Sequence, residues 1–193
     1  QAEAYGSYKM VDRLGLGGMG EVWRAEHNTL ARTAEIKLIL PDVLHRGGPA
    51  HRAQVIQRFE QEARTIAHLR SPHTVALYDF GLSHAGALYY VMELLDGVDL
   101  ETFVTEFGPL PPRRVIEILL QVCESLEEAH DAGLVHRDIK PANIFLCRLG
   151  LRCDVVKVLD FGLAKATQTD DAKLTGAGVI LGTPAYLPPE QAQ

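Results

Sequence analysis

The spacing of apolar residues along this 193-residue chain is mostly typical of strands before about residue 95 and mostly typical of helices after it, and this difference limits the possible folds more than any other feature. Residues 8–40 alternate between apolar and polar side chains around a glycine cluster, which predicts three strands joined by two turns. Residues 50–69 have apolar side chains at helical spacing, with a stop at Ser71-Pro72. Residues 74–82 and 87–94 predict two further strands. The first half of the chain is therefore expected to form a sheet with one main helix.

The second half is predicted to be mostly helical, beyond a flexible connector at Leu95-Asp96-Gly97. A short helix is expected at residues 99–106. A long helix begins at Pro111-Pro112, because proline suits the first helical turn, and Gly133 marks its stop. The expected buried face of the long helix comprises Val115, Ile118, Leu119, Val122, Leu126 and Ala129.

Two lobes of different character follow from this pattern. We expect an α+β fold in which residues 1–95 form a β-rich N-terminal lobe with one main helix. Residues 96–193 form a partial, mostly α-helical C-terminal lobe. Short apolar strands near Ile144–Cys147 and Val155–Leu159 are expected within it.

Composition argues against several classes of protein. A net charge of −6 and the lack of a Lys/Arg run argue against a nucleic-acid-binding surface. No stretch reaches the ~18 apolar residues of a membrane span. Three cysteines (Cys123, Cys147 and Cys153) without metal-ligand spacing predict reduced thiols in a cytosolic compartment. A disulfide between Cys147 and Cys153, which flank a short loop, is the alternative.

Four side chains in two neighbouring motifs are suited to phosphoryl transfer, which depends mostly on positioning and on charge neutralisation. The motifs are HRDIKPAN, which ends at Asn143, and DFG, which begins at Asp160. Asp138 is suited to deprotonate an acceptor hydroxyl, and Lys140 to offset charge on the transferred group. Asn143 and Asp160 offer the hard oxygen ligands that Mg²⁺ prefers. A polar turn that caps a helix is the alternative, but it accounts for only one or two of these residues.

A glycine cluster near the N-terminus predicts a loop that covers phosphates. Gly15, Gly17 and Gly20 give the pattern G-x-G-x-x-G, which is a weak signal alone because dinucleotide-binding folds share it. A strand follows from Glu21, whereas a dinucleotide fingerprint would open a helix. Glycines let backbone N–H groups approach phosphates without obstruction by a Cβ atom. An ordinary glycine-rich hairpin is the alternative.

Lys37 in the third predicted strand is expected to bind the α- and β-phosphates while a carboxylate of the helix holds it. We favour Glu62 as this carboxylate, because apolar residues of the expected buried face lie within one turn of it. Glu60 is the rival and lies about 200° around the helix, at ~100° per residue. A solvated edge lysine is the alternative for Lys37.

Together, these motifs resemble the bacterial Hanks-type serine/threonine protein kinases over residues 8–193. Three segments carry the resemblance: Gly17-Gly-Met-Gly-Glu-Val-Trp23, Lys140-Pro-Ala-Asn143 and Gly182-Thr-Pro-Ala-Tyr-Leu-Pro-Pro-Glu-Gln191. The resemblance implies a bilobal, protein-kinase-like fold with ATP and Mg²⁺ as cofactors. It also implies transfer of the γ-phosphoryl group to serine and threonine hydroxyls of protein substrates, as part of bacterial signalling.

The resemblance assigns further residues to the nucleotide site. Met92 is implied to be the gatekeeper, and Glu93 and Leu95 to present backbone groups to adenine. Leu14 and Val22, at the two ends of the glycine cluster, are implied to bind the cofactor as well.

The resemblance also implies activation by phosphorylation. Arg137 directly precedes Asp138, and its charge calls for a compensating anion such as a phosphothreonine. Thr175 fits the family spacing best, and Thr167 and Thr169 are alternatives. Self-association for autophosphorylation is the partner interaction that this implies.

The chain departs from the family pattern at a few places. Glu35 stands where the family has a small residue above adenine, so we expect it to crowd the base. Pro188-Pro-Glu190 replaces the usual Ala-Pro-Glu, and extra residues fit an enlarged, peripheral hairpin at Cys147–Asp154. The chain begins at Gln1 without Met or a signal pattern, and it ends at Gln193, where the family continues with several helices. We therefore expect a truncated domain of a longer protein, whose other parts would hold any membrane anchor.

Three functions were weighed. A serine/threonine protein kinase is favoured because Lys37, Asp138 and Asp160 are all present. A pseudokinase-like scaffold or nucleotide-binding regulatory module is the alternative, supported by Glu35 and by the truncation. A small-molecule phosphotransferase is disfavoured, because residues 182–191 resemble a platform for peptide substrates.

Overall fold

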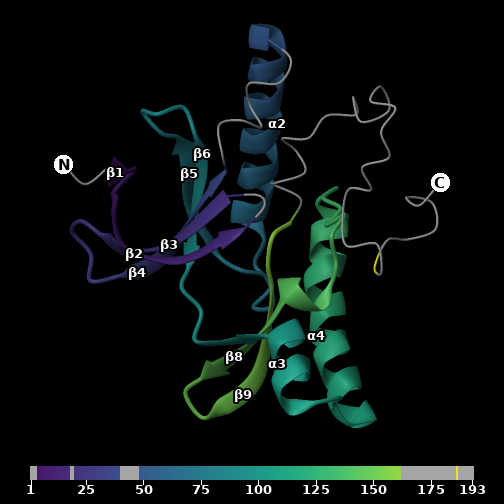
Figure 1. Ribbon diagram of the computed structural model, residues 1–193. Helices are drawn as coiled ribbons and strands as arrows, with labels where there is room; N and C mark the ends of the chain where they lie inside the picture. Colours follow the sequence, from purple (N-terminus) through teal and green to yellow (C-terminus); the bar gives the residue numbers. More distant parts are fainter. Residues whose placement is uncertain (1–3, 18–19, 40–47, 162–185, 187–193) are drawn as a thin grey trace. The chain divides into compact units, whose positions relative to one another are not determined.

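The computed structural model describes residues 4–17, 20–39, 48–161 and 186, and these fall into two compact units (Figure 1). The first unit draws on Gln1–His68 and Ala76–Leu94, and the second on Leu69–Val75 and Leu95–Gly162. The predicted boundary after residue 95 places Leu69–Val75 in the first lobe, which differs from the observed grouping. They group with the second unit because Thr74 forms a parallel bridge to Val158 and Val75 N–H donates to the Val158 carbonyl at 3.1 Å.

The first unit is built on an antiparallel sheet in the order β1-β2-β3-β4-β6-β5 (Figure 1). The strands are β1 (Ala4–Tyr5), β2 (Tyr8–Gly17), β3 (Gly20–His27), β4 (Thr33–Ile39), β5 (Leu77–Leu82) and β6 (Leu88–Glu93). The three strands expected in residues 8–40 and the two that follow are confirmed. Strand β1 was not predicted, because a two-residue strand leaves no alternation to detect.

Alternation along β4 gives the sheet two different faces. Ala34 and Ile36 are fully buried in a cluster with Tyr5, Tyr8 and Val91. Successive strand residues point to opposite faces, so Glu35 and Lys37 lie on the other face. The α2 helix (Gly48–His68) buries a stripe of Val55, Phe59, Ala63 and Ile66. Phe59 contacts the rings of Phe80 on β5 and Tyr90 on β6, so the predicted helix is confirmed; of the apolar residues predicted along it, Ala67 is exposed.

The second unit begins with a well-capped short helix. The α3 helix spans Leu100–Phe107, and Asp99 is its N-cap, accepting from Thr102 N–H at 2.8 Å and from the Thr102 hydroxyl at 2.7 Å. Such a cap contributes about 1 kcal/mol to helix stability. Gly108 ends the helix with a φ of 82°, a conformation that favours glycine. The predicted helix at residues 99–106 is therefore confirmed to within a residue at each end.

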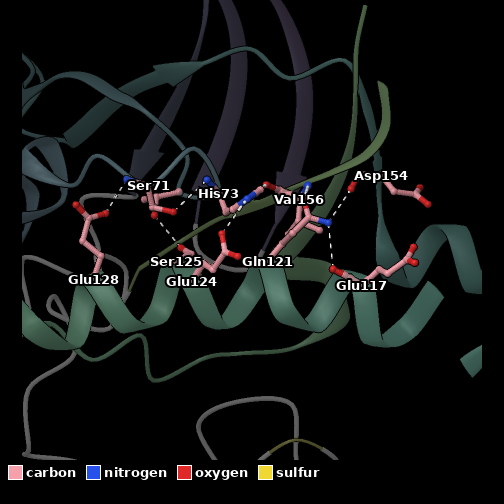
Figure 2. A network of polar contacts seen from close by, with 10 residues as sticks. Ser71, His73, Glu117, Gln121, Glu124, Ser125, Glu128, Asp154 and Val156 are labelled. Atoms are coloured by element: carbon pink, nitrogen blue, oxygen red, sulfur yellow. Dashed lines mark hydrogen bonds and ion pairs between the residues drawn. The ribbon is translucent and has the colours of Figure 1, made fainter. Parts of the chain in front are cut away.

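The long helix, α4 (Pro112–Asp131), buries a different stripe from the one predicted. Its buried residues are Ile118, Val122, Ser125 and Ala129, whereas Val115 and Leu119 are exposed. At ~100° per residue, the buried stripe is rotated by about 40° from the apolar face. The physical reason is that polar residues on this flank of α4 bind residues 70–74 and the neighbouring strand through hydrogen bonds (Figure 2).

A small sheet carries the motifs of the second unit. It has the order β7-β8-β9, formed by β7 (Gly97–Asp99), β8 (Ile144–Leu149) and β9 (Arg152–Val158). A 3-10 turn, η1 (Pro141–Asn143), precedes β8. The predicted β8–β9 hairpin is present, and its two strands are longer than expected. Cys147 is buried and Cys153 exposed, and no disulfide joins the two. None of the helices in the described ranges is long and apolar enough to cross a membrane.

Candidate active site

A buried histidine fixes the start of the HRDIKPAN motif. His136 is only 2% exposed, and its ring packs on Phe161 with centroids 4.8 Å apart. Nε2 lies 2.7 Å from the Leu159 carbonyl, which can only accept, so Nε2 carries a proton and donates. Nδ1 accepts from Asp138 N–H at 3.2 Å, which requires the neutral ring. Burial lowers the pKa of His136 and favours this neutral form.

Asp138, the candidate base, has one carboxylate oxygen, Oδ2, that is contacted by both Lys140 and Asn143. Lys140 Nζ lies 3.0 Å from Asp138 Oδ2, and the two side chains are 23% and 15% exposed. Asn143 Nδ2 donates to the same Oδ2 at 3.1 Å and to the Asp138 carbonyl at 2.8 Å. The structure thus brings Asp138, Lys140 and Asn143 into one cluster whose carboxylate has a fixed orientation.

Backbone hydrogen bonds tie this cluster to Asp160. Leu159 N–H donates to the Asn143 carbonyl at 2.9 Å, while the Leu159 carbonyl accepts from His136. Asp160 follows with a φ of 56°, a left-handed conformation that costs about 1–2 kcal/mol for a non-glycine residue. The loop and the start of the DFG motif therefore form one connected arrangement.

The donor atoms in this arrangement fit Mg²⁺. Asn143 is 6% exposed and uses its Nδ2 on Asp138, so its Oδ1 is the end suited to a metal ion. Asp160 adds a carboxylate. No group of three or more His, Cys, Asp or Glu side chains capable of holding a metal occurs among the described residues. Mg²⁺ typically takes one or two carboxylates and completes its shell with waters and phosphate oxygens.

The described glycines of the glycine cluster lie in the last part of β2 and at the start of β3, and they differ in what surrounds them. A Cβ atom at Gly20 would lie 1.6 Å from the Leu38 carbonyl oxygen, so only glycine fits. A Cβ atom at Gly15 would meet nothing within 4 Å, which leaves the backbone open to a ligand. Gly17 pairs with Gly20, and Gly15 with Val22. Leu14, in the register shift beside Gly15, is 51% exposed.

Lys37 and the two candidate carboxylates occupy β4 and α2. Lys37 is half-buried in register with Val22 and Tyr90, and its Nζ lies 6.0 Å from the Tyr90 ring centroid. Glu62 is half-buried with its Oε2 screened from solvent. The side chain of Glu60 is 47% exposed and approaches Arg64 at 4.0 Å. These differences favour Glu62 over Glu60 as the carboxylate that serves Lys37.

The end of β6 carries the residues assigned to adenine. Met92 is 3% exposed and lies opposite Glu35 of β4. Glu93 N–H donates to the Ala76 carbonyl at 3.0 Å, and its Oε1 accepts from Ala76 N–H at 2.8 Å. An adenine contact at Glu93 is therefore one for its carbonyl oxygen. Leu95, the first residue of the second unit after β6, is half-buried.

Several predicted residues lie outside the described ranges. They are Gly162 of the DFG motif, the candidate phosphorylation sites Thr167, Thr169 and Thr175, Thr183, and the segment Pro188–Glu190. Arg137 is described, and it is exposed with a φ of 64°.

The sequence reasoning missed the residues that hold β9 in place. His73 and Gln121 bind its backbone, and Glu128 binds the segment that contains His73. A signal was present, because Gln121, Ser125 and Glu128 recur at spacings of three and four along α4. We took the apolar face alone as the face that packs.

Comparisons with known proteins identify the family of this chain. The protein kinase domain model matches residues 8–193. The chain is 39% identical over 188 residues to the serine/threonine-protein kinase pkn3 of Myxococcus xanthus, covering 96% of this chain and 33% of that protein. It is 40% identical over 189 residues to PknB of Mycobacterium leprae, covering 96% and 29% respectively. The chain thus spans about a third of the length of these relatives.

Solved structures give the same result for the fold. The PknI kinase domain of Mycobacterium tuberculosis aligns with a TM-score of 0.69 and 29% identity, covering 83% of this chain and 61% of that chain. The PpkA-294 apo form aligns with a TM-score of 0.78 over all of this chain and 70% of that chain; at 23% identity it supports the fold alone. The predicted resemblance and bilobal α+β fold are confirmed, and the chain belongs to the protein kinase domain family.

Proposed function

We propose that this chain is the catalytic core of an ATP- and Mg²⁺-dependent serine/threonine protein kinase. The observation that carries the proposal is the cluster of Asp138, Lys140 and Asn143, joined through Leu159 to Asp160. A base, a cation and two oxygen ligands for a metal are the groups that phosphoryl transfer requires. The serine/threonine assignment rests on Lys140 in the catalytic loop and on the relatives named as serine/threonine kinases.

In this proposal each described side chain of the second unit has one role. Asp138 accepts the proton of the acceptor hydroxyl, and its orientation is set by Asn143. Lys140 places its ammonium beside that carboxylate, where it offsets negative charge on the transferred phosphoryl group. Asn143 Oδ1 and the Asp160 carboxylate hold Mg²⁺, which when bound neutralises charge on the phosphates.

The nucleotide roles belong to the first unit and to Leu95. Lys37 binds the α- and β-phosphates with Glu62 as its carboxylate, and the backbone at Gly15, Gly17 and Gly20 covers the phosphates. Leu14 and Val22 contact the nucleotide from the two ends of the glycine cluster. Adenine meets Met92 and the backbone of Glu93 and Leu95.

Regulation and location complete the proposal. A phosphothreonine at Thr175 compensates Arg137, and a second copy of the chain supplies it by autophosphorylation. We place the reaction in the cytoplasm, where ATP is available. No observation favours the pseudokinase-like alternative.

The proposal is tested by transfer of labelled γ-phosphate from ATP to a generic protein substrate. The purified protein should label the substrate on serine or threonine when Mg²⁺ is present. Asp138→Asn should lower kcat by a factor of about 10²–10⁴, because it removes the proton acceptor and keeps the shape. Equal labelling by the protein and by Asp138→Asn would remove the enzyme assignment.

A further inference from the structure

The strand that leads to Asp160 is an edge strand. In the order β7-β8-β9, only one side of β9 pairs with another strand of its sheet. The backbone groups on an outer edge need other partners, because an unpaired buried N–H or carbonyl costs free energy. The partners used here show what fixes the position of β9.

Gln121 of α4 binds the first part of this edge with both ends of its amide (Figure 2). Its Nε2 donates to the Asp154 carbonyl at 3.0 Å, and its Oε1 accepts from Val156 N–H at 3.1 Å. The amide thus substitutes for one residue of a neighbouring strand. The guanidinium of Arg114, about two turns before Gln121 on the same helix flank, adds two bonds of 2.7 Å to the Asp154 carboxylate.

His73 binds the rest of the edge. Its ring Nδ1 lies 3.0 Å from the Val156 carbonyl, and because a carbonyl can only accept, Nδ1 donates. Its own carbonyl accepts from Val158 N–H at 2.7 Å, and Val75 N–H donates to the Val158 carbonyl at 3.1 Å. The Asp154 carbonyl and both backbone groups of Val156 and of Val158 therefore have partners along this edge.

The segment that contains His73 is itself fixed by α4. The carboxylate of Glu128 accepts from Arg70 N–H and Ser71 N–H, each at 2.7 Å (Figure 2). The hydroxyls of Thr74 and Ser125 lie 2.7 Å apart in a buried position. One helix thus holds β9 directly through Gln121 and indirectly through His73.

We propose that Gln121 and His73 are positioning residues that set where Asp160 stands relative to Asp138 and Asn143. The inference rests on the proposed function, because it assigns a purpose to the placement of Asp160. Val158 is followed by Leu159, whose two backbone groups bind His136 and Asn143, and then by Asp160. A shift of β9 along its edge therefore displaces Asp160 directly. Because catalysis depends on exact placement, a displacement of ~1 Å costs on the order of a hundredfold in rate.

The test replaces the amide of Gln121 while keeping its volume. Gln121→Met removes both hydrogen bonds to β9 and preserves an unbranched side chain. Glu127→Met is the matched control, because Glu127 is an exposed residue on the same helix. ATP affinity is measured by calorimetry with Mg²⁺ and again in EDTA, and amide exchange of Val156 and Asp160 is measured without nucleotide.

Gln121→Met should weaken Mg²⁺·ATP binding about three- to tenfold, the loss expected from one or two hydrogen bonds, and leave binding in EDTA unchanged. Its Val156 and Asp160 amides should exchange faster than in Glu127→Met. An equal loss of affinity with Mg²⁺ and in EDTA, or no difference from the control, would overturn the inference. If the unaltered protein does not bind Mg²⁺·ATP, the proposed function itself fails. If it binds and Gln121→Met behaves like Glu127→Met, only the present inference fails.

A pair at His73 guards against a general loss of stability. His73→Asn keeps an N–H donor near the Val156 carbonyl, whereas His73→Leu keeps the bulk and removes the donor. His73→Asn should keep most of the Mg²⁺-dependent affinity for ATP, and His73→Leu should lose as much of it as Gln121→Met does. Equal behaviour of the two variants at equal Tm would overturn the role of His73.

Discussion

The two units position their functional residues by different means. In the second unit, the residues share partners: Asp138 Oδ2 binds both Lys140 and Asn143, and Leu159 binds both His136 and Asn143. In the first unit, the described nucleotide residues lie on separate elements, and the register of the sheet sets their places. Residues with shared partners affect each other when mutated, whereas distant residues behave additively. The proposed catalytic residues therefore form one coupled cluster, whereas the proposed nucleotide residues are distributed over several elements.

The largest effect should come from the residue with the most shared partners. Asn143→Ala removes the donor to Asp138 Oδ2 and the amide oxygen that serves the metal, so kcat should fall by about 10²–10⁴. In the double variant with Lys140→Ala, the loss should be smaller than the sum of the two single losses, because both act on one carboxylate. Steady-state kinetics of the four proteins checks this. Strict additivity would mean that the cluster is not coupled.

Two glycines of the first unit are expected to have different roles: Gly20 is needed for the fold, and Gly15 leaves its backbone open to a ligand. Gly20→Ala places a Cβ atom against the Leu38 carbonyl at a φ of +148°, so the free energy of unfolding should fall by about 2–3 kcal/mol. Gly15→Ala meets nothing and should change it by less than ~0.5 kcal/mol. Chemical denaturation measures both, and calorimetry should show weaker ATP binding for Gly15→Ala. Similar stabilities would contradict the distinction between the two glycines.

Glu35 tests whether the distributed site contains a residue that opposes binding. It is half-buried, on the same face of β4 as Lys37 and in register with Met92. If it crowds adenine at a cost of ~1–3 kcal/mol, Glu35→Ala should tighten ATP binding roughly five- to 150-fold. Calorimetry with ATP decides this, and Glu26→Ala, an exposed change on β3, is the control. Unchanged affinity would mean that the Glu35 side chain is harmless.

The sequence predicted the first unit better than the second, for a physical reason. Alternation and helical spacing report local burial, so β2 to β6 and α2 were found near their observed bounds. The clustering of Asp138, Lys140 and Asn143 could be predicted because the three residues lie close together in sequence, and their catalytic roles stay a prediction. The roles of His73 and Gln121 were not found, because each binds β9 across tens of residues. The rotated face of α4 was missed for the same reason: side-chain bonds to distant backbone decided which flank packs.

The smallest effect concerns the pH dependence of the coupled cluster. Burial lowers the pKa of His136 in the folded state below its ordinary value of about 6.5, and the ring is neutral there. Below pH ~6.5 the unfolded chain therefore binds a proton that the folded chain does not bind. The free energy of unfolding is unaffected by His136 above pH ~6.5 and falls as the pH drops towards the folded pKa. One proton limits the slope to ~1.4 kcal/mol per pH unit.

Denaturation midpoints between pH 7.5 and 5 should therefore decline less in His136→Phe than in the unaltered protein. Parallel declines would show that His136 does not carry the dependence. The neutral ring donates to the Leu159 carbonyl and accepts from Asp138 N–H. A decline in stability that depends on His136 would therefore show that protonation of this ring weakens the hydrogen bonds around Asp138.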